Sequence, residues 1–239
     1  MTRGRSVQVT VPALDPLRRH ESEGWDATMR RADDTTRRRG RPPKLDRRHA
    51  LVQAKLLFWQ HGYEHVGVSA LCSAFGVNPP SLYAAFGSKL NLFVEVLGEY
   101  RMVEGLGVFE AVERADTAPE AVRGLIDASV QLFAGSDTRR GCMIFEAASS
   151  PTAEVRSAAL PLLETHRTWV AGVLAARGDP EPECRAALLM TVLAGLSSVA
   201  RSGLEQPEIA RRAQALSTLV ASAAGGGTCD GARVPAAGR

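Results

Sequence analysis

The sequence of 239 residues contains little of what membrane, secreted or metal-binding proteins require. Its cysteines, Cys72, Cys142, Cys184 and Cys229, lie far apart, without a CxxC pair or a histidine at metal-ligand spacing. This pattern argues against a zinc site and against a disulfide framework. No run approaches the roughly 18 consecutive apolar residues of a membrane-spanning helix, and the N-terminal residues lack the apolar stretch of a signal peptide. The expectation is a cytoplasmic protein with reduced thiols and no membrane partner.

Sequence motifs of catalysis are equally scarce. The sequence contains no phosphate-binding glycine loop, no metal-ligand cluster and no triad spacing. His166 with Glu164 or Glu146 could form an acid–base pair, but no nucleophile accompanies them. Cys142 follows two arginines and could be an activated thiol, although a buried, small apolar side chain is the better interpretation. The chain is therefore predicted not to be an enzyme and to need neither cofactor nor metal.

The charges are segregated along the chain, although the formal net charge is only +3. Residues 1–29 carry four basic and four acidic groups, which cancel. Residues 30–49 carry nine basic and three acidic groups, a sum of +6, and residues 50–239 carry sixteen and nineteen, a sum of −3. A basic block in front of a slightly acidic body indicates an end of the chain that binds a polyanion.

The apolar pattern predicts an all-α fold. After the first 45 residues, apolar side chains recur at spacings of three and four, and strand and hairpin signals are scarce. The expected organisation is a disordered basic tail (1–45), a three-helix domain of helix-turn-helix type (46–97), a larger helical bundle (98–224) and a flexible tail (225–239).

Capping and turn residues predict the helix boundaries. In the smaller domain, helices are expected from Asp46 to His61, from Ser69 to Phe75, from Asn78 to Phe86 and from Ser88 to Tyr100. Asp46, Asn78 and Ser88 are the expected N-caps. In the larger domain, the expected helices are Pro119 to Ala134, Cys142 to Ser149, Thr152 to Ala176, Pro182 to Ser202 and Pro207 to Ala223.

The segment GYEHVGVSALCSAFGVNPPSLYAAFGSKLNLF closely resembles the DNA-binding domain of the TetR family of bacterial regulators. The match covers about residues 46–97. The resemblance implies a helix-turn-helix whose third helix enters the major groove of DNA. The residues that carry it are Gly62-Tyr63 at the end of the first helix, Gly76-Val77 in the turn, and Leu82, Tyr83, Phe86, Ser88 and Lys89.

The resemblance also implies which residues contact DNA. Tyr83 and Lys89 are expected to bind phosphates. The family usually has a Thr or Ser before the second helix, whereas this chain has Val66 and Gly67, and Ser69 is the expected substitute. Base contacts are expected from Asn78, Pro79, Ser81, Ala84 and Ala85, of which only Asn78 and Ser81 offer side-chain hydrogen bonds.

The basic tail offers a second mode of binding. The run Arg39-Gly40-Arg41-Pro42 resembles the core of an AT-hook, which places arginines in a narrow A·T-rich minor groove. The alternative is that Arg39, Arg41 and Lys44 bind phosphates without sequence preference.

In the resembled family the last two helices pair with those of a second copy, which implies a homodimer on a palindromic double-stranded DNA operator. The family also places a small-molecule effector inside the second domain, and the apolar side chains there predict a mostly apolar ligand. Binding is expected to act on DNA through the fourth helix. The predicted function is a repressor that the effector releases from DNA; the alternative is an architectural DNA-binding protein with an AT-hook-like tail and no ligand. The expected ligand-binding residues are Ile126, Phe133, Phe145, Leu162, His166, Trp169 and Leu189.

Overall fold

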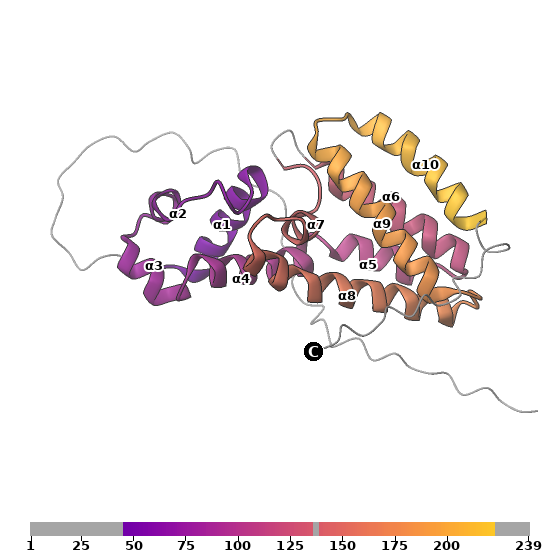
Figure 1. Cartoon of the computed structure of the whole chain (residues 1–239), viewed down its shortest axis with the longest axis horizontal. Helices are drawn as coiled ribbons and strands as arrows, with labels where there is room; N and C mark the ends of the chain where they lie inside the picture. Colours follow the sequence, from indigo (N-terminus) through magenta and orange to yellow (C-terminus); the bar gives the residue numbers. More distant parts are fainter. Residues whose placement is uncertain (1–44, 136–138, 223–239) are drawn as a thin grey trace, which may run out of the picture. The chain divides into compact units, whose positions relative to one another are not determined.

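The computed structural model describes residues 45–135 and 139–222, which form helices joined by loops (Figure 1). The all-α prediction is confirmed. Ten helices occur within the described ranges. They are α1 (Arg47–His61), α2 (Val68–Phe75), α3 (Pro79–Phe86), α4 (Lys89–Val103), α5 (Leu106–Glu113), α6 (Ala118–Ala134), α7 (Met143–Ala148), α8 (Ala153–Ala176), α9 (Pro182–Arg201) and α10 (Gln206–Ser222).

Local capping determines where α1, α3 and α4 begin. The side chains of Asp46, Asn78 and Ser88 each accept a hydrogen bond from backbone N–H groups two or three residues further on. These bonds satisfy N–H groups that have no partner inside a helix. All three predicted N-caps are confirmed.

Glycine sets the turn between α2 and α3. Gly76 has a φ of 66°, in the left-handed region that favours glycine, and its N–H bonds back to the end of α2. At the other end, α2 begins at Val68, one residue before the predicted Ser69, and its N-cap Gly67 provides no side-chain hydrogen bond. The turn is therefore where the sequence predicted it, and α2 begins without a side-chain cap.

Aromatic rings fill the core beneath the first helices. The rings of Phe58 and Phe93 meet edge to face with centroids 5.0 Å apart, and Tyr63 lies 4.9 Å from Phe93. Such edge-on pairs add to the stabilisation from burying apolar surface. They attach α1 to α4, so the first helix is fixed on the helix that continues into the rest of the protein.

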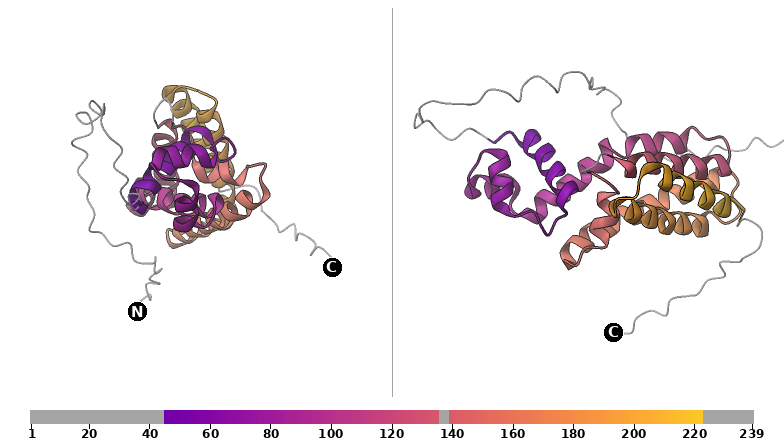
Figure 2. Two further views of the ribbon diagram at one scale, coloured as in Figure 1. Left: turned by 90° about the vertical axis from the view of Figure 1, so that its left-hand side faces the viewer. Right: turned by 90° about the horizontal axis from the view of Figure 1, so that it is seen from above.

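The remaining helices form a bundle. Helices α6, α8, α9 and α10 run alongside one another, and α5 packs against α6 (Figures 1 and 2). Their apolar faces meet in the interior, where Ile126, Val155 and Leu189 are completely buried. This bundle surrounds the cavity described below.

Helix α5 was not predicted from the sequence. It follows α4 after only Glu104 and Gly105, and it contains Gly107. Glycine weakens a helix by about 1 kcal/mol relative to alanine, so the local pattern does not indicate a helix here. Packing against α6 stabilises it instead.

One cysteine departs from the expectation of reduced thiols. Cys184 is disulfide-bonded, so that expectation is wrong for this residue. Cys72 and Cys142 are free and buried, and burial raises the pKa of both thiols. For Cys142 this confirms the interpretation as a buried small side chain rather than an activated thiol.

Helix α9 is more apolar than the sequence pattern suggested. By length and composition alone it could cross a membrane, because an 18-residue stretch within it has a mean hydropathy of 1.4. One such helix does not indicate a membrane span, because core helices of soluble proteins can be equally long and apolar. Helix α9 packs against α6, α8 and α10, yet only 39% of this 18-residue stretch is buried within the chain. Part of its apolar surface therefore remains uncovered.

Candidate functional site

Helix α3 has one buried face and one exposed face. Leu82 is fully buried and Phe86 is 4% exposed, so these residues hold α3 against the neighbouring helices α2 and α4. On the other face Tyr83 is 46% exposed, and Ala84 is exposed as well. An exposed helix face with small side chains can approach the base edges closely, because the major groove accommodates an α-helix.

Few side chains on this face can form hydrogen bonds with bases. Asn78 Oδ1 already accepts the Ser81 backbone N–H at 3.0 Å, which leaves its amide N–H groups for a base. Ser81 is half-buried, and Pro79 is exposed but has no donor. On α3 and its N-cap, two side chains therefore offer hydrogen bonds to a base edge, and Ala84 offers an apolar contact.

The lysine expected to bind phosphate is held by an aromatic ring. Lys89 Nζ lies 4.0 Å from the centre of the Tyr63 ring, a cation–π contact. Burial lowers the pKa of Lys89, and the nearby Glu64 carboxylate opposes this effect. Lys89 is the first residue of α4, where free backbone N–H groups also favour an anion. Ser69, the expected substitute contact, is exposed in the first turn of α2.

The charge of the three-helix region is mostly compensated. Arg47 pairs with Glu95 at 2.6 Å, and the nearly buried Lys55 pairs with Glu104 at 3.0 Å. Among the Lys and Arg residues of positions 46–97, this leaves Arg48 and Lys89 without a carboxylate partner among the described residues. The other predicted cationic contacts, Arg39, Arg41 and Lys44, lie outside the described residues.

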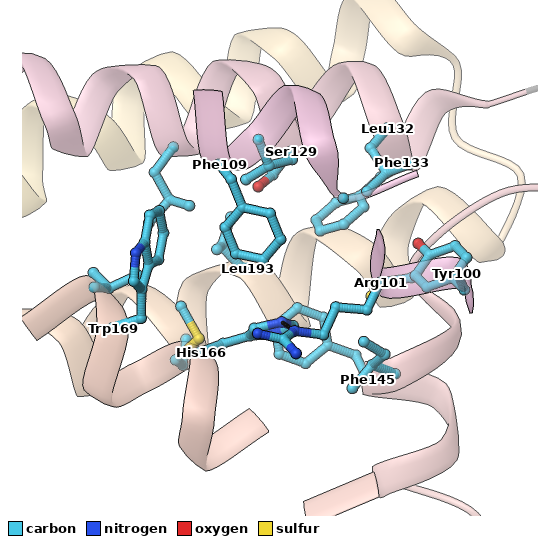
Figure 3. Close-up of a pocket in the computed structure, with 17 residues that line it drawn as sticks. Tyr100, Arg101, Phe109, Ser129, Leu132, Phe133, Phe145, His166, Trp169 and Leu193 are labelled. Carbon is cyan, nitrogen blue, oxygen red and sulfur yellow. Dashed lines mark hydrogen bonds between the residues drawn. The ribbon is translucent and has the colours of Figure 1, made fainter. Parts of the chain in front are cut away.

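A cavity of about 70 Å³ lies inside the bundle (Figure 3). Its walls are mostly apolar and aromatic, as in typical ligand pockets. Of the residues predicted to bind a ligand, Phe133, Phe145, His166 and Trp169 line it. The structure does not bring the other three to this cavity: Ile126 and Leu189 are completely buried in the core, and Leu162 is half-buried.

The cavity also has walls that sequence reasoning missed. Val108 and Phe109 come from α5, and Tyr100 and Arg101 come from the end of α4. The residues of α5 were missed because no helix was predicted there. Tyr100 was predicted as the last residue of the connecting helix and Arg101 was assigned to no element, and no local signal shows that they face the interior of the other domain.

The polar side chains that line the cavity include Tyr100, Arg101, Ser129 and His166. Arg101 Nε donates to His166 Nε2 at 3.1 Å (Figure 3). Burial, with the adjacent Arg101 charge, lowers the pKa of His166 to about 4, so its ring is neutral at pH 7. The Tyr100 hydroxyl is buried next to the Cys142 thiol, with no hydrogen bond of ordinary geometry among the described residues, and burial raises its pKa well above the usual value.

The neutral state of His166 predicts how stability depends on pH. Because its folded pKa is lowered, the unfolded state binds the proton first as pH falls, and stability is lost between about pH 6.5 and pH 4. Replacing His166 by glutamine should remove on the order of 2 kcal/mol of this pH dependence. Thermal unfolding across the pH range measures it, with His61→Gln on an exposed histidine as the control. Equal pH profiles for wild type and His166→Gln would contradict the prediction.

The acid–base pair considered from the sequence is not formed. Glu164 is exposed and pairs with Arg167 at 2.5 Å, and Glu146 pairs with Arg201 at 2.6 Å. Glu146 and Thr191 instead line a larger, open groove of about 620 Å³. This groove has fewer aromatic walls than the cavity, which makes it the weaker candidate for an apolar ligand.

The first helix is directly connected to the cavity wall. Trp59 of α1 meets the ring of Tyr100 edge to face, with centroids 5.0 Å apart. Its indole N–H donates to the carbonyl of Gly141 at 3.2 Å, next to the cavity residue Cys142. Arg201 adds a third connection by donating to the Trp59 carbonyl at 3.3 Å. Trp59 therefore joins the first helix to the cavity wall by direct contacts.

Similarities to known proteins agree with this geometry. A family profile described as bacterial regulatory proteins, tetR family, matches residues 50–96. The HTH-type transcriptional repressor BdcR of Escherichia coli K12 is 32% identical over 164 residues, which are 69% of this chain and 83% of the relative. The chain belongs to the tetR family. The repressor ComR of the same organism is also 32% identical, over 69% of this chain and 84% of its own length.

A solved structure of the family shows the same fold in complex with DNA. The regulator CifR, as a cysteine variant bound to a 26 bp operator, is 32% identical, with a TM-score of 0.67 over 77% of this chain and 99% of the CifR chain. The present protein is thus a DNA-binding transcriptional regulator of the tetR family with an N-terminal helix-turn-helix domain and a helical ligand-binding domain. None of these similarities supports the architectural alternative.

Proposed function

We propose that this tetR-family regulator is a homodimeric repressor that leaves a palindromic operator when a small molecule enters the cavity of the helical bundle. The observation that carries the proposal is the contact of Trp59 with Tyr100, because it joins a DNA-reading domain to a cavity wall. The names of BdcR and ComR as repressors support the direction of control. Effector and operator are then linked reciprocally, so each weakens binding of the other.

A dimer is supported by the uncovered surface of α9. Leu188, Thr191, Gly195 and Ser198 are exposed at spacings of three and four residues, so they share one face of the helix. The face is apolar or uncharged, and small side chains allow close approach of a second helix. Two copies related by a twofold axis can pair these faces and present two α3 helices to half-sites about one turn of DNA apart.

We also propose that DNA binding and effector binding belong to separate domains, with the boundaries that the sequence suggests. Residues 46–97 read DNA, with the basic residues of the 1–45 tail as additional contacts, and residues 98–224 bind the effector and the second copy. Helix α4 runs through the proposed boundary without a break. It therefore carries both a phosphate contact at Lys89 and a cavity wall at Arg101.

The proposed phosphate contacts predict a specific salt dependence. Lys89→Ala should weaken binding to the operator and to related DNA sequences by a similar factor. It should also reduce the slope of log K against log salt concentration by roughly one unit. Tyr83→Phe should weaken binding by loss of one phosphate hydrogen bond with an unchanged slope. Fluorescence anisotropy at several salt concentrations measures both. The control is Arg114→Ala, which removes an equal charge at an exposed position on α5; an equal slope for wild type and Lys89→Ala would refute the phosphate assignment.

Footprinting of genomic fragments tests the function itself. A regulator protects a short palindromic site, with a matching footprint on each half. Binding that grows with fragment length and ignores sequence would instead favour an architectural role through the tail residues Arg39, Arg41 and Lys44. Repression is then checked with a reporter placed behind the protected site.

A further inference from the structure

Arg101 is a cation without an anionic partner in the wall of an apolar cavity. Its Nε donates to His166, and its guanidinium carbon lies 5.8 Å from the centre of the Phe109 ring. Among the described residues, no carboxylate forms an ion pair with Arg101. The two terminal nitrogens of the guanidinium likewise have no hydrogen-bond acceptor in the described part of the chain.

His166 does not compensate this charge. Its Nε2 accepts the proton of Arg101 Nε, so the ring is neutral and carries its own proton on Nδ1. The lowered pKa of His166 agrees with this state. The arrangement aligns the guanidinium through one bond and leaves its two terminal N–H pairs available, the geometry with which arginine binds a carboxylate in bidentate fashion.

The rest of the cavity favours a small planar body. Phe109 and Trp169 meet edge to face with centroids 4.9 Å apart, and Phe145 stands on the opposite wall (Figure 3). The cavity volume of about 70 Å³ is less than a single aromatic ring requires, so a ligand must displace a wall as it enters. Phe145 and Arg101 are both half-buried, so either can move outward to admit a ligand.

We infer that the cavity binds a small organic carboxylate, with the carboxylate on the free face of the Arg101 guanidinium and an apolar body of about one ring among Phe109, Phe145 and Trp169. This inference rests on the proposed function, because it names the effector class of the same site. It also revises the expectation of a mostly apolar ligand, since a neutral molecule would cover the half-buried Arg101 guanidinium without supplying an anion for its charge. The buried Tyr100 hydroxyl provides a further hydrogen bond for a substituent on the ring.

The ligand class also explains how binding reaches the DNA. Arg101 is on α4, the helix that begins at the phosphate contact Lys89. Its neighbour Tyr100 touches Trp59. A carboxylate that draws Arg101 toward the cavity therefore acts on both connections to the DNA-reading helices.

Matched pairs of probes test the charge requirement. Benzoate and phenylacetate are compared with benzamide and phenylacetamide, which have nearly the same shape and no charge. Binding to the full chain without DNA is measured by ligand-observed NMR and calorimetry. We expect the acids to bind at millimolar concentration or better and the amides to bind on the order of 10- to 100-fold more weakly.

Variants of Arg101 identify the cation. Arg101→Met should weaken the acids by on the order of 10- to 100-fold and leave the amides unchanged. Arg101→Lys should retain part of the affinity, because it keeps the charge but loses the bidentate geometry. The matched control is Arg114→Met on the exposed end of α5, which should bind all probes as wild type does. Circular dichroism confirms that each variant is folded.

The outcomes separate this inference from the proposed function. Equal binding of acids and amides, binding of none of the acids, or acid binding that Arg101→Met does not change would each overturn the carboxylate assignment. Operator release is measured separately by adding the acids to the protein–DNA complex. Acids that bind through Arg101 but leave operator affinity unchanged would leave the ligand class standing and refute effector control of DNA binding.

Discussion

Leu188→Glu is expected to convert the protein from a dimer to a monomer and to reduce operator affinity by on the order of 10² to 10⁴-fold. Leu188 is 41% exposed on α9, on the face that we propose to meet a second copy. Burying a carboxylate there without a cation costs several kcal/mol, and the twofold interface would contain two such carboxylates. Because one operator half-site then binds one copy alone, the affinity gained from simultaneous contact with both half-sites is lost. Light scattering measures the mass, and anisotropy measures DNA binding.

The control for this prediction is Leu160→Glu. Leu160 is 54% exposed on α8 and is not part of the proposed face of α9, so the same substitution there should leave both mass and DNA binding unchanged. A monomer from Leu160→Glu together with a persistent dimer from Leu188→Glu would place the interface on another surface.

The choice of Leu188 shows what the sequence could not decide. The apolar stripe of α9 includes Leu189 and Leu196 as well, and the sequence pattern alone favours Leu196 as the position at which to test dimerisation. Leu196 is only 3% exposed within the single chain, so its replacement by glutamate would test folding. An amphipathic pattern identifies apolar positions, but it does not tell which of two neighbouring faces contacts the chain itself.

The DNA-reading domain was largely predictable, because its signals are local. Asp46, Asn78 and Ser88 cap helices by bonds to residues two or three positions away, and Gly76 sets the turn by its own conformation. Each of these requirements is visible within a few residues of sequence. For this reason, predicted and observed helix starts agree to within one residue for α1 to α4.

The cavity was only partly predictable, because its walls come from helices far apart in the sequence. His166 and Trp169, which were predicted to bind a ligand, line the cavity, whereas Phe109 belongs to α5, a helix that was not predicted and that contains Gly107. Arg101 was not considered, because the helix predicted from the sequence ends one residue earlier, at Tyr100. Its burial against His166 depends on packing between α4 and α8.

Trp59→Phe is expected to cost about 2 to 4 kcal/mol of folding stability and to weaken the response of DNA binding to the effector. The phenylalanine keeps an aromatic ring beside Tyr100 but removes the N–H that bonds to Gly141. The Gly141 carbonyl then lacks a donor in a buried position, and the smaller ring leaves a void, since Trp59 is only 4% exposed. Thermal unfolding should show a fall in Tm of roughly 5 to 15 °C.

The effect on the response separates a signalling contact from a merely structural one. Operator affinity is measured with and without a carboxylate that binds the cavity, and the ratio gives the coupling free energy, typically about 1 to 3 kcal/mol in such systems. Leu71→Ala is the matched control, because Leu71 is completely buried within the DNA-reading domain and its loss should lower stability by a similar amount. We expect Trp59→Phe to reduce the coupling and Leu71→Ala to preserve it. Full coupling in Trp59→Phe would show that α4 alone carries the signal, without a contribution from the bond between Trp59 and Gly141.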